Sequence, residues 1–410
     1  MHYCSASPAV DEIQRLPSGP PSLFNHGAQS EFFHLGKLPM NCRVHLIAAA
    51  RPNFMKIAPL YHVLAEQPWI DARIVHTGQH YDRNMSENFF LDLRLPDPHF
   101  HLEVGSGTHA EQTAKVMVAY EKICSRRSRP DWTIVVGDVN STIACALAAT
   151  KLWIPVIHLE AGLRSSDRRM PEEINRLVTD AISDVLWTPS PDADENLLRE
   201  GVAPERIDRV GNIMIDSYEM MRPQIEAAPG PRKFGLRRGE YAVVTLHRPS
   251  NVDQRETLVS LVTQLHSTSA YLPLLFAVHP RTRKKLVEFG LWASLESNPS
   301  LRLTEPLGYV EFMALVSAAR LVITDSGGVQ EESTYLGIPC LTLRENTERP
   351  ITVMQGTNRL VPSHLLTANV QGVLRGEWAK GMCPQSWDGR TALRCLAALK
   401  RRHEAMVATH

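Results

Sequence analysis

The sequence predicts two doubly wound α/β domains, each built on a parallel sheet with helices on both faces. Short and uniformly apolar runs alternate with segments of helical periodicity from residue 43 onward. Strands that are apolar on both faces are typical of parallel sheets covered by helices. The alternation stops once, at 227–239, where Pro, Gly and basic residues predict a linker, and then begins again.

Residues 1–40 lack this pattern. They are rich in Pro, Ser, Gly and His and show no helix or strand period, so we expect a disordered N-terminal extension. A secretory signal would need a basic start followed by a continuous apolar stretch, and neither is present.

The first domain is expected at 41–226. Its first strand, Arg43–Ala50, is followed by helical spacing over Lys56–Glu66, and an alanine-rich helix is expected over Ser141–Lys151. Right-handed crossovers would connect the parallel strands. The further strands expected here are Ala72–His76, Trp132–Val136, Ile154–Leu159, Val185–Trp187 and Arg206–Val210.

The second domain is expected at 240–390, and a C-terminal helix at 391–410 that packs back on the first domain. Ligands of such sheets bind beyond the carboxyl ends of the strands, so the polar residues that follow each strand are the candidates for a site. The strands expected here are Tyr241–Leu246, Leu274–Val278, Leu301–Leu303, Leu321–Thr324 and Pro339–Leu343.

Composition excludes several classes of protein. The chain has 44 Lys and Arg against 44 Asp and Glu, and this zero net charge argues against a general binder of nucleic acid or anionic membranes. No apolar run approaches the roughly 20 residues that span a bilayer. The seven cysteines form no Cys-x-x-Cys pair, so we expect a reduced, cytoplasmic compartment.

A dinucleotide cofactor is not expected. The first strand-to-helix turn should read Gly-x-Gly-x-x-Gly, but here it reads Ala-Ala-Ala-Arg-Pro-Asn-Phe-Met-Lys. Gly105–Ala110 matches the glycine pattern weakly and lies far from the first strand, where a loop is the better interpretation. The same turn instead holds Arg51 and Lys56, two cations placed for a phosphate. A solvated helix start is the alternative for these two residues.

A clearer phosphate signal follows the strand Leu321–Thr324. Asp325-Ser326-Gly327-Gly328 opens a helix there, and paired glycines let an anion approach the backbone N–H groups, with Ser326 as a further donor. Glu331, a few residues into the helix, could bind ribose hydroxyls. The alternative is a tight turn capped by Asp325.

Three carboxylates form another group. Asp138 and Glu160 each end a first-domain strand, and Glu172 follows in the Arg-Met-Pro-Glu-Glu segment. Carboxyls brought close together would push their pKa values apart, leaving one able to act as a base and another as an acid. Helix caps or ion pairs are the alternative. Nearby partners for such pairs are Arg164, Arg168, Arg169 and Arg176.

Histidines also follow strands. His247 and His279 would make the second-domain side of the site basic enough for a diphosphate. His158 and Glu160 share a strand face, which could suggest a metal, but no further ligands occur at a recognised spacing, so no metal is expected.

Taken together and in this order, the motifs resemble the non-hydrolysing UDP-N-acetylglucosamine 2-epimerases from about Val44 to Leu399. Each motif is modest alone, but nine of them in the family's order are highly specific. The matching segments are Ala-Arg-Pro-Asn-Phe-Met-Lys-Ile-Ala-Pro (50–59), His-Thr-Gly-Gln-His (76–80), Val-Gly-Asp-Val-Asn-Ser-Thr (136–142), His-Leu-Glu-Ala-Gly-Leu-Arg-Ser (158–165), Pro-Glu-Glu-Ile-Asn-Arg (171–176), Val-Gly-Asn (210–212), Thr-Leu-His-Arg (245–248), Asp-Ser-Gly-Gly-Val-Gln-Glu-Glu (325–332) and Thr-Glu-Arg-Pro (347–350).

The resemblance implies a glycosyltransferase-B-like fold with the active site between its domains, and a homodimer. It implies interconversion of UDP-N-acetylglucosamine and UDP-N-acetylmannosamine without metal or nicotinamide, by elimination of UDP to 2-acetamidoglucal and re-addition with inversion at C2. Asp138, Glu160 and Glu172 match the family's acid/base carboxylates, and His247 matches the histidine near the diphosphate. The matches to the UDP-binding positions are Arg51, Lys56, Ser326, Gly327, Gly328 and Glu331.

This chain departs from the family at two segments. Many members have Gly-Thr-Arg-Pro-Glu at 49–53 and His-Arg-Arg-Glu-Asn at 247–251, where this chain has Ala-Ala-Arg-Pro-Asn and His-Arg-Pro-Ser-Asn. In members activated by their own substrate, the second segment and the Gln-His loop help form the activator site. Gln79, Arg248 and His279 are its candidates here, while Asp82 replaces a usual Gln.

Other functions stay open at this point. The wording of two motifs is also similar to relatives acting on UDP-2,3-diacetamido-glucuronate. A family-B glycosyltransferase would share the fold and the donor but needs an acceptor pocket. A non-catalytic nucleotide-sugar sensor is the alternative outside enzymes, and three carboxylates beside a diphosphate argue against it.

Overall fold

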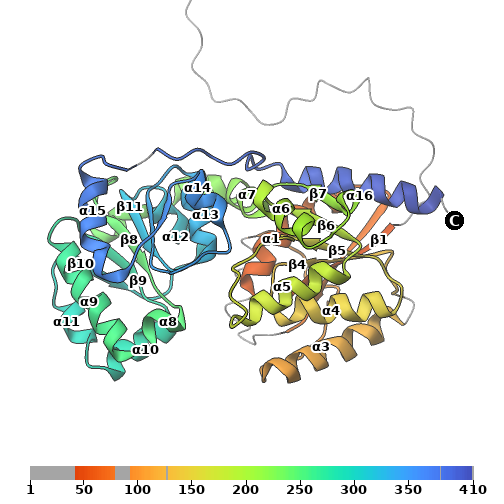
Figure 1. The fold of residues 1–410 in the computed structure, drawn as a ribbon, viewed down its shortest axis with the longest axis horizontal. Helices are drawn as coiled ribbons and strands as arrows, with labels where there is room; N and C mark the ends of the chain where they lie inside the picture. The colour runs from red at the N-terminus through yellow and green to blue at the C-terminus, as the bar shows by residue number, and fades with distance from the viewer. Residues whose placement is uncertain (1–41, 79–92, 126–127, 379, 409–410) are drawn as a thin grey trace, which may run out of the picture. The chain divides into compact units, whose positions relative to one another are not determined.

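The computed structural model describes residues 42–78, 93–125, 128–378 and 380–408, so the expected N-terminal extension lies outside it. Two parallel sheets organise this part of the chain (Figure 1), and both belong to one compact unit. The prediction of two doubly wound sheets is therefore confirmed.

The first sheet has seven strands in the described part, in the order β3-β2-β1-β4-β5-β6-β7, and every pair is parallel. The order reverses between β1 and β4, which is where ligands of such sheets bind. The strands are β1 (Cys42–Ala48), β2 (Ile70–His76), β3 (Phe100–His101), β4 (Trp132–Val136), β5 (Val156–Leu159), β6 (Val185–Thr188) and β7 (Ile207–Arg209).

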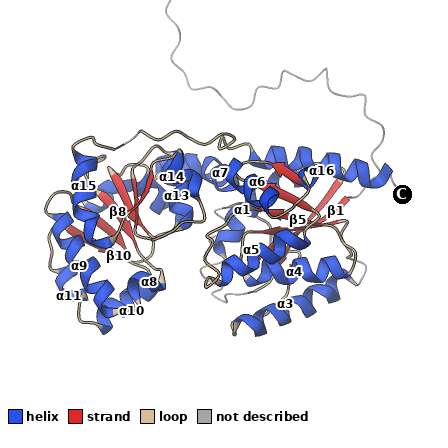
Figure 2. Ribbon diagram, in the orientation of Figure 1, coloured by secondary structure: helices blue, strands red, loops and turns tan. Residues whose placement is uncertain are grey.

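Helices cover both faces of this sheet (Figure 2). Leu46 of β1 points into a core shared with α1, α7 and α16, whereas its neighbour Ile47 packs with α3 and α4 on the opposite face. This alternation is the reason why the strand is apolar throughout. The helices are α1 (Arg51–Ala65), α3 (His109–Cys124), α4 (Asn140–Lys151), α5 (Pro171–Ile182), α6 (Pro191–Arg199), α7 (Ile213–Ala227) and α16 (Thr391–Ala408).

The second sheet has six strands in the described residues, in the order β10-β9-β8-β11-β12-β13, all parallel. The strands are β8 (Ala242–Thr245), β9 (Leu274–Ala277), β10 (Leu301–Thr304), β11 (Leu321–Thr324), β12 (Cys340–Thr342) and β13 (Asn358–Leu360). The helices are α8 (Pro249–Val252), α9 (Arg255–Ser269), α10 (Pro280–Glu288), α11 (Trp292–Glu296), α12 (Tyr309–Val316), α13 (Gly327–Tyr335), α14 (Pro350–Met354) and α15 (Leu366–Leu374).

The C-terminal helix α16 packs on α1 and α7 through Ala392, Cys395 and Leu399. Its first turn is held by Asp216 of α7, whose carboxylate accepts the backbone N–H groups of Thr391 and Ala392 at 3.0 and 2.8 Å. A carboxylate at this end is favourable because the first N–H groups of a helix lack backbone partners. The division into domains at 227–239 stays a prediction.

The structure corrects several element boundaries. The first helix begins at Arg51, five residues before the expected Lys56, because Ala50 is extended and the backbone turns helical directly after it. The expected linker contains a short 3-10 helix, Gly230–Phe234. Strands β3 and β13 were not predicted, because neither carries an apolar run: β3 is Phe-His and β13 is Asn-Arg-Leu. None of the described helices combines the length and apolarity needed to cross a bilayer.

Candidate active site

The carboxylates Asp138 and Glu160 follow the neighbouring parallel strands β4 and β5. The two turns are hydrogen-bonded where the strands end, since the Gly137 N–H donates to the Leu159 carbonyl at 3.1 Å. Gly137 has φ +68°, and a Cβ there would lie 3.3 Å from Lys56 Nζ and 3.7 Å from Glu160 Oε2. Glycine at this position therefore leaves room for the charged pair beside it.

Glu160 is buried and holds its carboxylate against Lys56. Lys56 Nζ lies 2.5 Å from Oε2, and the side chains are only 12% and 4% exposed. Oε1 is buried and has no hydrogen-bond partner among the described residues. The backbone of Glu160 has φ +71°, which is strained for a residue with a side chain. Backbone strain together with an unpaired buried oxygen is a combination that concentrates at functional sites.

Asp138 is paired with Arg176 of α5, at 2.5 Å from Oδ2 to Nη1. Arg176 is 2% exposed and also binds Glu173 at 2.6 Å. Asn175 donates from Nδ2 to the Asp138 carbonyl at 2.8 Å, so both the side chain and the backbone of Asp138 are anchored to the same helix. Ion pairing was the alternative for this carboxylate, and its partner is Arg176, while Arg169 binds Asp167 instead.

Helix α5 presents a polar face to these turns. Glu172, Arg176 and Asp180 lie four residues apart and therefore share one side of the helix. Arg176 and Asp180 are buried, whereas Glu172, the second residue of the helix, is partly exposed. The third predicted carboxylate thus belongs to the helix that holds Asp138.

On the second sheet, Asp325 follows β11 and is fully buried. Its carboxylate lies 2.8 Å from His247 Nδ1 and accepts the backbone N–H of Arg248 at 2.9 Å and the Asn251 amide at 2.9 Å. Burial by itself would raise the pKa of Asp325, but His247 and the other donors hold it below its usual value. Asp325 is therefore not the cap of α13, a position taken by Ser326, but the anchor of the turn that carries His247.

His247 and His279 lie together, with ring centroids 5.5 Å apart. Burial lowers the pKa of His279, and the neighbouring charge of His247 adds to the effect. His279 Nδ1 accepts the Arg281 backbone N–H at 3.2 Å. His279 is therefore a neutral ring that carries its proton on Nε2 and can donate it to an anion.

The paired glycines open α13, and they differ in what surrounds them. A Cβ on Gly327 would lie 2.7 Å from Glu348 Oε1, so packing within the protein requires glycine there. A Cβ on Gly328 would meet nothing within 4 Å among the protein atoms. Open space over the first turn of a nine-residue helix fits the predicted approach of an anion to the backbone.

Glu331 connects the two sheets. Its Oε1 accepts the amide of Asn212, which caps α7, at 2.9 Å and lies 2.8 Å from Arg349 Nε, while Oε2 is buried without a hydrogen-bond partner in the described part of the chain. Burial raises its pKa, and Glu160 adds to the shift against the opposing charge of Arg349. Glu160, at the edge of the first sheet, is thus close enough to act electrostatically on Glu331, beside the second sheet.

Arg349 was not among the predicted site residues. Its side chain is 9% exposed and lies between Glu331 at 2.8 Å and Glu348 at 3.1 Å. Glu348 also pairs with Arg344 at 2.7 Å and Arg248 at 3.5 Å, and these cations hold its pKa well below the usual value despite burial. Arg349 belongs to the Thr-Glu-Arg-Pro motif (347–350), which could have indicated it, but the sequence assigned no role to any residue of this motif.

The structure describes only some of the remaining predicted site residues. Arg51 is the first residue of α1. Gln79 and Asp82 lie outside the described residues, and the candidate activator residue Arg248 has its guanidinium on Glu348. Within the described ranges, no group of three His, Cys, Asp or Glu side chains is arranged to hold a metal ion.

Glu332, next to Glu331, is a further buried carboxyl. Burial raises its pKa to about 8, and the charge of Glu331 adds to the shift. The ordinary pKa of a glutamate side chain is 4.5. Between pH 4.5 and about 8, the folded chain therefore keeps the Glu332 proton that the unfolded chain has released. The contribution of Glu332 to the free energy of unfolding is therefore fully present below pH 4.5, and it is lost as the pH rises toward 8.

Replacing Glu332 by Gln should remove this pH dependence. At pH 7 the variant is expected to be more stable by about 3 kcal/mol, from 1.36 kcal/mol per pKa unit, and near pH 4.5 the two proteins should be equal. Thermal melting across this range measures the difference. The exposed Glu296→Gln is the matched control. A variant that melts below the parent at pH 7 would contradict a protonated Glu332.

Comparisons with known proteins point to one family. Residues 62–400 match the family model described as UDP-N-acetylglucosamine 2-epimerase. The UDP-N-acetylglucosamine 2-epimerase of Methanocaldococcus jannaschii is 45% identical over 324 residues, which cover 78% of this chain and 88% of that protein. A UDP-2,3-diacetamido-2,3-dideoxy-D-glucuronate 2-epimerase of Pseudomonas aeruginosa is 40% identical, with the same coverage of 78% and 88%.

Solved structures give the same result. The M. jannaschii UDP-GlcNAc 2-epimerase in complex with UDP-GlcNAc and UDP superposes with a TM-score of 0.80 at 41% identity, over 88% of this chain and 99% of that chain. A lipopolysaccharide outer core galactosyltransferase superposes with a TM-score of 0.51 at 13% identity, over 88% of this chain and all of that one, and shows the fold alone. The predicted glycosyltransferase-B-like fold is confirmed.

Proposed function

Because this chain belongs to the UDP-N-acetylglucosamine 2-epimerase family, we propose that it interconverts UDP-N-acetylglucosamine and UDP-N-acetylmannosamine by eliminating UDP and adding it back. The observation that carries the proposal is the buried pair of Glu160 and Lys56 at the end of β5, next to Asp138. Epimerisation at C2 needs a proton removed from one face of the sugar and returned on the other, and this requires at least two acid/base groups.

Glu160 is the strongest candidate for the base. A base must be ionised and must have a free lone pair in a site that excludes water. The ammonium of Lys56 lies 2.5 Å from Oε2, and Oε1 is buried without a hydrogen-bond partner among the described residues. Asp138 and Glu172 then supply the proton on the opposite face. Asp138 is anchored by Arg176, and Glu172 stands partly exposed on α5.

The second sheet would stabilise the leaving UDP. As the bond from C1 breaks, negative charge grows on the diphosphate, and donors that are already in place stabilise it without reorganisation. His247 is held by Asp325, and His279 beside it carries a proton on Nε2. Together with the open helix start at Gly328, they support the predicted UDP-binding role of Ser326, Gly327 and Gly328.

The sugar has one specific rival. The relative of P. aeruginosa named for UDP-2,3-diacetamido-2,3-dideoxy-D-glucuronate is 40% identical to this chain, close to the 45% of the M. jannaschii enzyme. Both reactions need the same C2 chemistry, so the acid/base groups do not separate them. We therefore propose UDP-N-acetylglucosamine as the substrate and keep the diacetamido sugar as the comparison in the assay.

Incubation with UDP-N-acetylglucosamine in D2O tests the function. We expect deuterium at C2 of both epimers and the appearance of UDP-N-acetylmannosamine, read by mass spectrometry and NMR. The same incubation with UDP-2,3-diacetamido-glucuronate ranks the two sugars by kcat/KM. Absence of C2 exchange with either sugar, with added UDP included, would refute epimerisation. Free N-acetylmannosamine would identify hydrolysis instead.

Three further assignments are part of the proposal. The chain acts as a homodimer in the cytoplasm, following the family resemblance and the absence of a Cys-x-x-Cys pair. Gln79, Arg248 and His279 contribute to an activator site. Sedimentation equilibrium measures the assembly. A lag in turnover of UDP-N-acetylmannosamine that added UDP-N-acetylglucosamine removes would support activation, and simple hyperbolic kinetics without a lag would contradict it.

A further inference from the structure

His158 is a buried histidine that the proposed chemistry does not use. It lies on β5 two residues before Glu160 and is 0% exposed. Its Nδ1 lies 2.5 Å from Asp180 Oδ1, and its Nε2 lies 2.8 Å from the Gly137 carbonyl oxygen. Both nitrogens are therefore engaged, which leaves none for a metal ion.

The partners of His158 determine its protonation. The backbone carbonyl of Gly137 only accepts hydrogen bonds, and so does the carboxylate of Asp180 when ionised. Burial alone would raise the pKa of Asp180, but His158 and Arg164 together hold it below the ordinary value. A ring that faces an acceptor at each nitrogen carries a proton on each, so His158 is a buried imidazolium.

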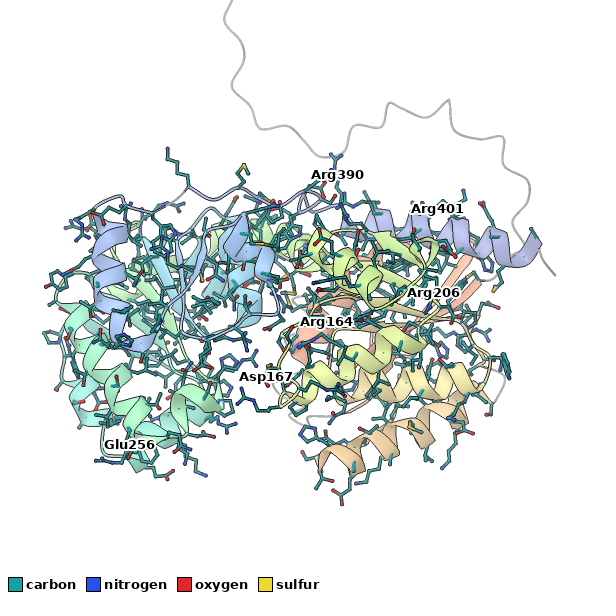
Figure 3. The ribbon with its side chains drawn as sticks, in the orientation of Figure 1. Arg164, Asp167, Arg206, Glu256, Arg390 and Arg401 are labelled. Atoms are coloured by element: carbon teal, nitrogen blue, oxygen red, sulfur yellow. The ribbon has the colours of Figure 1, made fainter. Side chains whose placement is uncertain are left out.

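Charges around this imidazolium are balanced. Asp180 Oδ2 accepts the Gly162 N–H at 3.0 Å and lies 2.7 Å from Arg164 Nη1. Arg164, in the segment that joins β5 to α5 and labelled in Figure 3, also holds Glu200 at 2.7 Å. Buried charges are tolerated when each has partners of this kind.

The cluster connects the two turns that carry Asp138 and Glu160. Gly137 directly precedes Asp138, and Gly162 lies two residues after Glu160. His158 donates to the Gly137 carbonyl in the first turn, and Asp180 accepts the Gly162 N–H in the second turn. The contact between His158 and Asp180 therefore joins the turns by side chains, in addition to the backbone ladder of the strands.

We propose that His158 is a positioning residue for proton transfer, an imidazolium that fixes the turn carrying Asp138 relative to the turn carrying Glu160. The inference rests on the acid/base roles proposed above. Displacement of a reacting group by about 1 Å can lower a rate on the order of 10²-fold, so two turns that move independently would slow the chemical step more than binding.

Two amide variants separate the two contacts of the ring. In His158→Gln the amide nitrogen takes the place of Nε2 and can still donate to Gly137, whereas in His158→Asn it takes the place of Nδ1 and can reach only Asp180. Each variant breaks one of the two contacts that join the turns, so kcat is expected to fall about 100-fold in both. KM and the Kd for UDP should stay within about 3-fold in both.

Controls keep the result separate from misfolding. UDP titration gives the fraction of competent sites, and rates are expressed per competent site, with the exposed His364→Gln as the matched histidine control. A kcat equal to that of the parent in either variant, or a loss confined to KM, would overturn the proposal. Failure of the wild-type chain to exchange C2 deuterium would instead refute the proposed function.

A measurement on the wild-type chain does not depend on variants that fold. ¹⁵N-edited NMR should show one histidine ring whose two nitrogens both carry a proton and are both protected from exchange. A spectrum in which every protected histidine ring is a neutral tautomer would overturn the imidazolium.

Discussion

Replacing Glu160 by Gln is expected to lower kcat about 10³-fold, within the range that general acid–base catalysis contributes. The amide has nearly the shape of the carboxylate and can still accept from Lys56, but it cannot take up a proton from C2. KM and UDP affinity should change only a few-fold, because most of the groups proposed to bind the diphosphate belong to the second sheet. Steady-state kinetics, UDP calorimetry and C2 exchange in D2O measure these quantities.

The matched control is Glu296→Gln, which makes the same change on an exposed helix. Asp138→Asn and Glu172→Gln complete the series. The variant that removes the opposite-face acid should also lose overall turnover. Near-full activity in all three variants would refute the roles of all three carboxylates. In Glu160→Gln, Lys56 remains buried beside a neutral group, which is expected to destabilise the fold. The melting temperature therefore distinguishes loss of catalysis from loss of folding.

Replacing Arg349 by Met is expected to destabilise the fold by about 3–5 kcal/mol, the usual effect of removing one partner from a buried ion pair. Arg349 is the shared partner of Glu331 and Glu348, at 2.8 and 3.1 Å. Without it, Glu331 loses the cation that opposes its burial and must take up a proton or move toward water, whereas Glu348 keeps Arg344 and Arg248.

Melting temperature and chemical denaturation measure this effect, with the exposed Arg237→Met as the control. The loss should grow as pH rises, because high pH keeps the unpaired carboxyl of Glu331 ionised. Stability within about 0.5 kcal/mol of the parent, the usual range for surface substitutions, would show that Arg349 is not the partner that these carboxylates require.

The departures from the family pattern have a local explanation in the structure. Asn53 stands where many members have Glu, and its amide accepts the Ala50 N–H at 3.1 Å and donates to the Val136 carbonyl at 3.1 Å. An ionised Glu cannot donate to that carbonyl. Asn251 is retained in the second departing segment, and it ties Asp325 to the Leu343 carbonyl.

Sequence alone predicted the two sheets, the position of most strands and the carboxylates that follow β4 and β5. These features depend on local patterns: apolar runs of strand length, helical spacing and polar residues just past a strand. Strands Trp132–Val136 and Leu321–Thr324 were predicted with their observed bounds. The two strands that were missed, Phe-His and Asn-Arg-Leu, carry no apolar run.

Tertiary structure decided which charges meet. Lys56, predicted to bind UDP, lies against Glu160, which is 104 residues away in the chain. The partner of Asp138 is Arg176, and neither Arg168 nor Arg169. Asp325 anchors the His247 turn 78 residues away, whereas the alternative considered from sequence was a local cap. Such partners are brought together by strand order and helix packing, and no spacing along the chain records them.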